Sequence, residues 1–183
     1  LHLEGRARTL TYITAEVPGF FPYTTIPTNA EIEPEIQALV SNSSFGYPQR
    51  VATGFDSRRM AILIAVLEKR SGLNLGSQDV FINVAGGLRT GEPSVDLGAA
   101  LAMASSYRDR PVSGGTLAIG EVGLGGEIRP VAQAGRRVME AHNLGFQRCL
   151  LAKPNLAELA APPGMDVVGV ADIDAAQDVA LGG

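Results

Sequence analysis

The chain has 183 residues, of which 45% are hydrophobic, so it has the size of one domain with enough apolar side chains for a packed core. Its formal net charge of −4 does not indicate a protein that binds nucleic acid or a membrane surface through bulk charge. No apolar run approaches the roughly 18 residues that span a bilayer, and no signal-peptide pattern opens the chain, so we expect a cytoplasmic protein.

Residues 1–35 have no sustained period of either 2 or 3.6, and they carry several prolines and clustered carboxylates. This pattern predicts a linker or extended arm rather than part of the folded domain. The chain starts at Leu1 and not at a methionine. We therefore expect residues 1–35 to join the domain of residues 36–183 to an upstream domain that is missing here.

The first predicted elements of that domain are two strands and a helix. Residues 36–40 and 50–54 have the composition of strands. A helix is predicted over 57–71, starting at Asp56 or Ser57 and ending at a Gly72 cap. Because it is apolar almost all round between Met60 and Leu67, we expect it to be buried between layers.

The middle of the chain continues this alternation. It predicts a strand over 79–87, a helix over 93–109 with Pro93 at its first position, and a strand over 116–122. The glycine-dense GEVGLGGEIRPV predicts a hairpin, with Gly125 and Gly126 supplying the positive dihedrals of its turn.

The last predicted elements are a helix over 132–145, strands over 147–152 and 166–170, and a helix over 172–181. Alternating helices and strands predict a layered α/β fold, with mixed sheets packed against helices. The one cysteine, Cys149, lies in the apolar run RCLLA, which indicates a buried thiol and not a disulfide or metal site.

Few residues suggest chemistry. There is no phosphate-binding G-x-x-x-x-G-K-[ST] loop, the glycine run precedes a strand and not a helix, and His2 and His142 have no partners at zinc-site spacing. We expect no cofactor and no metal in this fragment. Ser94 is the one candidate nucleophile, because backbone N–H groups at a helix start stabilise an oxyanion. Its base would have to be a lysine with a lowered pKa.

The motifs GEPSVDLGAALA and GEVGLGGEIRPVAQAGRRVMEAHNLGF resemble the proteolytic domain of Lon, with its serine–lysine dyad. Laid on that pattern without a gap, Ser94 falls on the nucleophile and Arg137 on the lysine. A guanidinium cannot take a proton from Ser94, so both are expected to be vestigial, and no catalytic residue is expected. His142 is about 140 degrees around the helix from Arg137 and is a poor substitute base. Lys69 and Lys153 fall on no motif but stay open, and the alternative is an active Lon-type serine peptidase that uses Ser94.

A closer resemblance covers residues 36–183. The helix end VLEKR-GL, the helix start E-x-x-x-DL and the hairpin GEVGL-GEIRPV together resemble the C-terminal Lon-like domain of the RadA (Sms) family of bacterial DNA repair proteins. The resemblance implies a ring homo-oligomer, a hexamer, that loads on branched DNA and drives branch migration. It implies that ATP with magnesium, and also zinc, would be bound only by upstream domains that are missing here.

The same resemblance implies a full-length DNA-dependent ATPase, whereas this fragment is not expected to be an enzyme by itself. Its partners would be single-stranded or branched DNA, further copies of the chain and the recombinase RecA, with no membrane.

Basic residues are segregated along the chain. Net charge is +3 over residues 50–70, +2 over 127–148 and −4 over 153–183. Arg89 and Arg129 sit at glycine-flanked turns and match basic positions of the RadA pattern, so they are the favoured DNA contacts. Two interpretations stay open beside this one: ordinary solvated arginines, or an Arg129 that pairs with Glu127 or Glu121 at a subunit contact. Weaker DNA candidates, which could equally pair with carboxylates, are Arg58, Arg59, Arg136 and Arg137.

Overall fold

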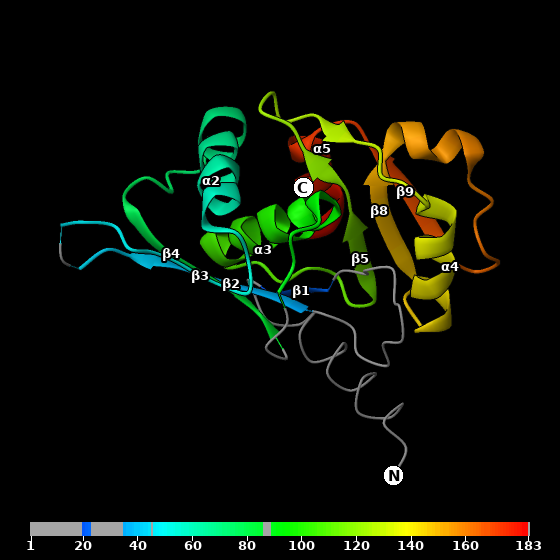
Figure 1. The fold of residues 1–183 in the computed structure, drawn as a ribbon, viewed down its shortest axis with the longest axis horizontal. Helices are drawn as coiled ribbons and strands as arrows, with labels where there is room; N and C mark the ends of the chain where they lie inside the picture. Colours follow the sequence, from blue (N-terminus) through cyan, green and yellow to red (C-terminus); the bar gives the residue numbers. More distant parts are fainter. Residues whose placement is uncertain (1–19, 23–34, 45, 86–88, 183) are drawn as a thin grey trace, which may run out of the picture.

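The computed structural model describes residues 20–22, 35–44, 46–85 and 89–182, and Figure 1 shows their arrangement. Helices and strands alternate along most of the chain and form mixed parallel and antiparallel sheets. The predicted α/β fold class is therefore confirmed. No helix of the described residues is both long and apolar enough to cross a membrane.

The first sheet packs one face against the central helix α3. Its strand order is β1-β2-β4-β3, with β1 and β4 antiparallel to β2, and β3 parallel to β4. Alternate residues such as Ile36, Ala38, Val80 and Ile82 are buried, which gives the period of 2 expected for one covered face. The bounds are β1 (Phe20–Pro22), β2 (Glu35–Asn42), β3 (Arg50–Thr53) and β4 (Gln78–Val84).

One strand of this sheet comes from the predicted arm. Phe20–Pro22 pairs antiparallel with Glu35–Gln37, so four residues of the predicted arm, Phe20–Pro22 and Glu35, belong to the folded domain. The other residues before Glu35 lie outside the described part of the chain, as do residues 86 and 87 of the strand predicted over 79–87. The interpretation of residues 1–35 as a linker stays a prediction.

Helix α2 (Ser57–Ser71) has the predicted bounds. The Asp56 side chain accepts from the Arg59 amide at 2.7 Å, and Gly72 closes the helix with a φ of 66°. The prediction that this helix is buried on all sides is wrong, because Ala61 and Ala65 face solvent. Alanine counts as apolar in a sequence pattern, but its small side chain costs little free energy when it is exposed to solvent. The apolar run therefore did not reveal that one face of the helix is exposed.

Helix α3 (Asp96–Arg108) is the helix that is buried all round. It follows a single 3₁₀ turn, η2 (Pro93–Val95), so the predicted helix start is confirmed with a tighter first turn. Every residue from Asp96 to Ser105 is buried. The small side chains of Gly98, Ala99, Ala100, Ala102 and Ala104 let the surrounding layers approach α3 closely.

The second sheet is parallel, with strand order β5-β8-β9. It consists of β5 (Thr116–Ile119), β8 (Arg148–Ala152) and β9 (Asp166–Val170). Helix α4 (Ala134–Asn143) lies on the side of this sheet away from α3, and α5 (Ile173–Leu181) contacts α3 (Figure 1). The sequence did not predict the 3₁₀ segment η3 (Lys153–Glu158).

The strand predicted over 116–122 is divided at Gly120, and its second part forms the predicted hairpin with β6 (Glu121–Val122) and β7 (Ile128–Arg129). Gly120 donates its amide to the Ser94 carbonyl at 2.8 Å and accepts from the Leu97 amide at 3.0 Å. A Cβ at Gly120 would lie 2.7 Å from Ile128. Of the two glycines predicted to have positive φ in the turn, only Gly126 does, at 86°.

Cys149 is buried on β8, as predicted, and burial raises the pKa of its thiol to about 12. We expect no reaction with a thiol reagent at pH 8 in the folded chain and full reaction in guanidinium, because the thiolate is the reactive form. Absorbance with a chromogenic disulfide measures both. Stoichiometric reaction of the native chain within seconds would contradict this burial.

Candidate functional site

Ser94 lies at the start of the buried helix, where main-chain contacts fix it. It is buried within η2, and its carbonyl accepts from the Gly120 amide. Pro93 precedes it at the first position of the 3₁₀ turn. Ser94 is therefore held rigidly at the junction of η2, α3 and the β5–β6 bend.

Arg137 from α4 reaches Ser94, and these are the two residues that fall on the dyad positions of the Lon pattern. Its side chain is 3% exposed, and its Nη1 donates to the Ser94 Oγ at 3.3 Å. It also donates from Nε to the Ala132 carbonyl at 3.2 Å and forms an ion pair with Glu92. Glu92 and Arg137 thus tie the segment before Ser94 to α4.

This arrangement provides a cation but no base. A guanidinium keeps its proton at accessible pH, so it donates to the Ser94 hydroxyl and cannot activate it. Among the described residues, no lysine or histidine hydrogen-bonds to Ser94. Lys69 and Lys153 are exposed near the end of α2 and at the start of η3.

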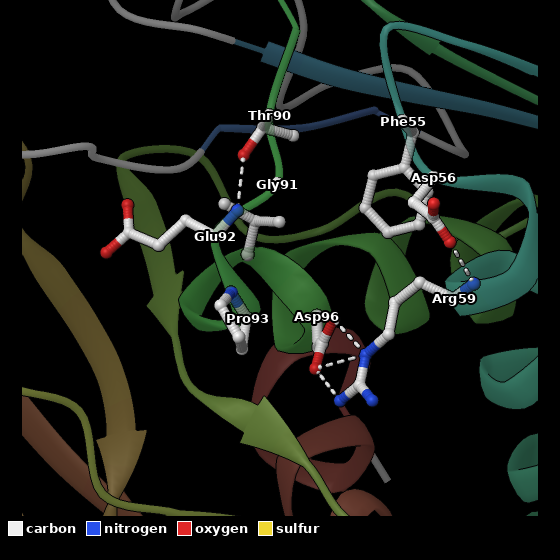
Figure 2. Close-up of a pocket in the computed structure, with 9 residues that line it drawn as sticks. Phe55, Asp56, Arg59, Thr90, Gly91, Glu92, Pro93 and Asp96 are labelled. Carbon is white, nitrogen blue, oxygen red and sulfur yellow. Dashed lines mark hydrogen bonds and ion pairs between the residues drawn. The ribbon is translucent and has the colours of Figure 1, made fainter.

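A cavity of about 210 Å³ opens beside this site, between the start of α2 and the segment that leads into η2. Figure 2 shows Phe55 above and Pro93 at lower left, with the Arg59–Asp96 pair below Phe55 and to the right of Pro93. The side chain of Glu92 points away from that pair (Figure 2), toward its partner Arg137.

The Arg59–Asp96 pair joins three elements, and the sequence did not reveal the role of Asp96. The Asp96 side chain is 1% exposed; both its oxygens accept from Arg59 Nε at 2.9 Å, and Oδ2 also accepts from the Val122 amide at 3.2 Å. Arg59 Nη2 in turn donates to the Val122 carbonyl at 2.9 Å. The pair therefore links α2, α3 and β6.

Burial raises the pKa of the Asp96 carboxyl above its ordinary value, while the hydrogen bonds and the charge of Arg59 oppose that rise. The hydrogen bond to Asp96 raises the pKa of the Arg59 guanidinium. An acidic residue at the start of an apolar helix was the one sequence feature that could have drawn attention to Asp96. The sequence did not identify Arg59 as its partner.

Arg129 is engaged by two carboxylates of its own chain. Its Nη2 lies 2.7 Å from Glu127 Oε1, and its Nη1 lies 3.4 Å from Glu121 Oε1. The hydrogen bond from Arg129 lowers the pKa of the Glu127 carboxyl. The pairing with Glu127 and Glu121 that the sequence left open thus occurs within one chain, although the Arg129 side chain stays 52% exposed.

The other DNA candidates form two groups, those paired with a carboxylate and those exposed without an ion pair. Arg59 and Arg137 are held by Asp96 and Glu92. Arg58 in the first turn of α2, Arg89 before η2 and Arg136 on α4 are exposed. None of these three forms an ion pair with another described residue.

Residues 34–155 match the family described as subunit ChlI of Mg-chelatase. The chain belongs to this family. It is also 48% identical over 149 residues to the DNA repair protein RadA of Bacillus subtilis (strain 168), which covers 81% of this chain and 32% of that protein.

Two further relatives carry the same name. The DNA repair protein RadA of Escherichia coli (strain K12) is 47% identical over 145 residues, covering 79% of this chain and 31% of that protein. The DNA repair protein RadA of Streptococcus pneumoniae (strain ATCC BAA-255 / R6) is 43% identical over 139 residues, covering 76% of this chain and 33% of that protein. The chain spans about a third of the length of these relatives.

Within its described residues, no group of three or more His, Cys, Asp or Glu could hold a metal ion.

Substitution of Asp96 by alanine should lower the free energy of unfolding by about 3–5 kcal/mol, because it leaves the Arg59 guanidinium without its buried partner. Urea unfolding followed by circular dichroism measures the change. The matched control is Glu127→Ala, which removes a carboxylate from an exposed pair and should leave the midpoint close to that of the unsubstituted chain. Equal effects of the two substitutions would contradict the structural role assigned to Asp96.

Ser94 should not react with a fluorophosphonate, and the chain should not cleave casein, because the group that contacts its hydroxyl is a permanent cation. Intact-mass spectrometry and release of labelled peptide test the two statements, with an active Lon-type peptidase as the positive control. A covalent adduct that is lost in Ser94→Ala together with peptide turnover would establish a peptidase.

Proposed function

We propose that this chain is a DNA-binding and assembly domain of a DNA repair protein and has no peptidase activity. The proposal rests on two kinds of support. Curated relatives at 43–48% identity are named DNA repair protein RadA. The contact between the buried Arg137 and Ser94 occupies the position where a peptidase would need a neutral amine.

The contact between Arg137 and Ser94 is the observation that carries the inactive assignment. A lysine in that position could lose its proton and activate the hydroxyl, whereas arginine cannot. The ion pair with Glu92 gives Arg137 a structural role in place of the catalytic one. The domain would then act through its surface and its contacts with other copies, with a ring, a hexamer, as the expected assembly.

Exposed arginines without carboxylate partners are the best groups for phosphate contacts. Arg89, Arg58 and Arg136 meet this description within the described residues, and Arg89 keeps first place among them. Arg129 would have to exchange Glu127 for a phosphate, so it contributes less than an unpaired arginine. Contacts of this kind are independent of base sequence and weaken steeply with salt.

In the whole protein, ATP hydrolysis, with magnesium and zinc, would belong to upstream domains. The present domain would place DNA against the ring and hold the subunits together. Single-stranded or branched DNA and RecA are the proposed partners, in the cytoplasm. Each of these assignments follows from the resemblance to RadA proteins and remains a proposal for this chain.

The double substitution Arg89→Ala with Arg129→Ala should weaken binding to single-stranded DNA. With a slope of about 0.7 per phosphate contact, removal of one such contact at 0.15 M salt lowers affinity about 4-fold, and removal of two lowers it about 14-fold. The slope of log affinity against log salt should fall by about 0.7 for each arginine–phosphate pair that is removed. Fluorescence anisotropy with labelled oligonucleotide, measured over a salt series, gives both quantities.

A control with the same loss of charge is Arg50→Ala with Arg148→Ala, on β3 and β8. It should reduce affinity much less, because the Arg50 guanidinium donates to main-chain carbonyls and Arg148 pairs with Asp166, so neither cation is free for a phosphate. Unchanged binding of the first pair would refute the assignment of Arg89 and Arg129. An equal loss of DNA affinity in the two double variants would mean that affinity depends on net charge and not on these particular arginines.

A further inference from the structure

Strand β3 forms an open edge of the first sheet. It is the last strand in the order β1-β2-β4-β3, and among the described residues it pairs only with β4. The Val80 amide donates to the Gln49 carbonyl at 2.9 Å, so the main chain of residue 49 faces β4. Because main-chain direction alternates along a strand, Val51 also faces β4, whereas the main-chain groups of Arg50 and Ala52 point outward from the sheet.

The side chains on the uncovered face of this sheet form an apolar row that ends at the edge. Leu39, Phe81 and Val51 are direct neighbours across β2, β4 and β3. Leu39 is 58% exposed and Val51 44% exposed, while α3 covers the opposite face. The next row, Gln37, Asn83 and Thr53, is polar.

This edge lacks the features that usually keep sheet edges apart. No proline or acidic residue occurs in β3, and its one charge is turned away. The Arg50 guanidinium donates to the Leu75 carbonyl at 2.8 Å and to the Gln49 carbonyl at 3.0 Å, so it folds back onto the domain. After Thr53 the edge is closed, because the Gly54 carbonyl accepts from the Thr90 amide at 2.9 Å.

We propose that two copies of this chain pair through β3, antiparallel, about a two-fold axis at Val51. In that register, Arg50 of each copy exchanges main-chain hydrogen bonds with Ala52 of the other, and the two Val51 residues form the closer, non-hydrogen-bonded pair. The apolar row then runs without a break from Leu39 of one copy to Leu39 of the other. A two-fold axis brings identical groups together, and this edge is suited to that because its outward donors and acceptors are self-complementary and uncharged.

The contact is small, because each copy contributes one short strand and, from the apolar row, only Val51 at the edge itself. It belongs to the weak end of specific interfaces, so pairing should depend on protein concentration. The inference concerns how copies meet and does not depend on DNA binding. A two-fold contact can also join two rings, so it adds to the assembly proposed above.

The two-fold register can be tested with single cysteines. Across a non-hydrogen-bonded pair the Cα atoms lie about 4.5 Å apart, within the range that a disulfide spans, so Val51→Cys should form a covalent dimer under mild oxidation. Thr53→Cys is the matched control, with an exposed side chain on the same strand and face. In this register the two Thr53 residues lie about 13 Å apart, so they should not cross-link. Cys149 is buried and should not compete.

A second pair of variants tests the main-chain hydrogen bonds. Ala52→Pro removes an outward N–H without touching the bonds between β3 and β4, so it should abolish pairing in the folded chain. Ala52→Gly keeps the N–H and should still pair. Sedimentation velocity over a concentration series should show the unsubstituted chain and the glycine variant reaching twice the mass of the proline variant, whether that variant sediments as a single chain of 19.1 kDa or as a ring.

A disulfide dimer of the Val51 variant alone, with pairing abolished only in the proline variant, supports the proposal. Equal cross-linking of the Thr53 variant, no cross-linking of either, or pairing that survives Ala52→Pro overturns it. Oligonucleotide binding measured on the same samples separates this result from the proposed function. If DNA affinity fails while Val51 still cross-links, the DNA proposal falls and the β3 contact stands.

Discussion

The buried carboxylate of Asp96 is the constraint on which the start of α3 depends. A helix enclosed on all sides needs partners for every polar group at its N-terminal end, and Asp96 finds them in Arg59 and the Val122 amide. Because Arg59 belongs to α2 and Val122 to β6, a single ion pair sets the positions of three elements. The Ser94 carbonyl, just before α3, is satisfied by the Gly120 amide. The position of the Ser94 hydroxyl therefore follows from requirements of folding, whether or not it reacts.

Arg137 joins α4 to the segment before η2 through a buried charge. The side chain is buried and carries a permanent charge, which needs a nearby carboxylate to offset the cost of desolvation. Glu92 provides it, and the Ala132 carbonyl and the Ser94 hydroxyl accept two further hydrogen bonds. A lysine there could alternate between charged and neutral forms, whereas the arginine acts only as a fixed cross-link between α4 and the segment before η2.

Sequence patterns predicted most elements, because caps and periodicity are local. Asp56 and Gly72 gave both ends of α2, and the match to the Lon motifs singled out Ser94 and Arg137, which the structure shows in contact. What could not be predicted depends on residues distant in sequence. The exposure of Ala61 and Ala65, the division of a strand at Gly120 and the pairing of Arg59 with Asp96 are decided by which elements meet. The orientation of the Arg129 side chain could not be predicted either. At a glycine-flanked turn, an arginine can project into solvent or pair with a neighbouring carboxylate, as Arg129 does with Glu127.

Charge in this domain is arranged so that acidic groups neutralise some arginines and leave others free. Along the hairpin, Asp96, Arg59, Glu121, Arg129 and Glu127 alternate in sign, each within ion-pair distance of the next. A phosphate approaching Arg129 must compete with two fixed carboxylates, whereas near Arg89 or Arg136 it meets no such competitor among the described residues. The acidic total of the chain therefore says little about DNA, because affinity for a phosphate chain depends on which cations are unpaired and exposed. By the same reasoning, two copies of a negatively charged chain can approach at the β3 edge, because β3 has no acidic residue and its one charge, on Arg50, folds back onto the domain.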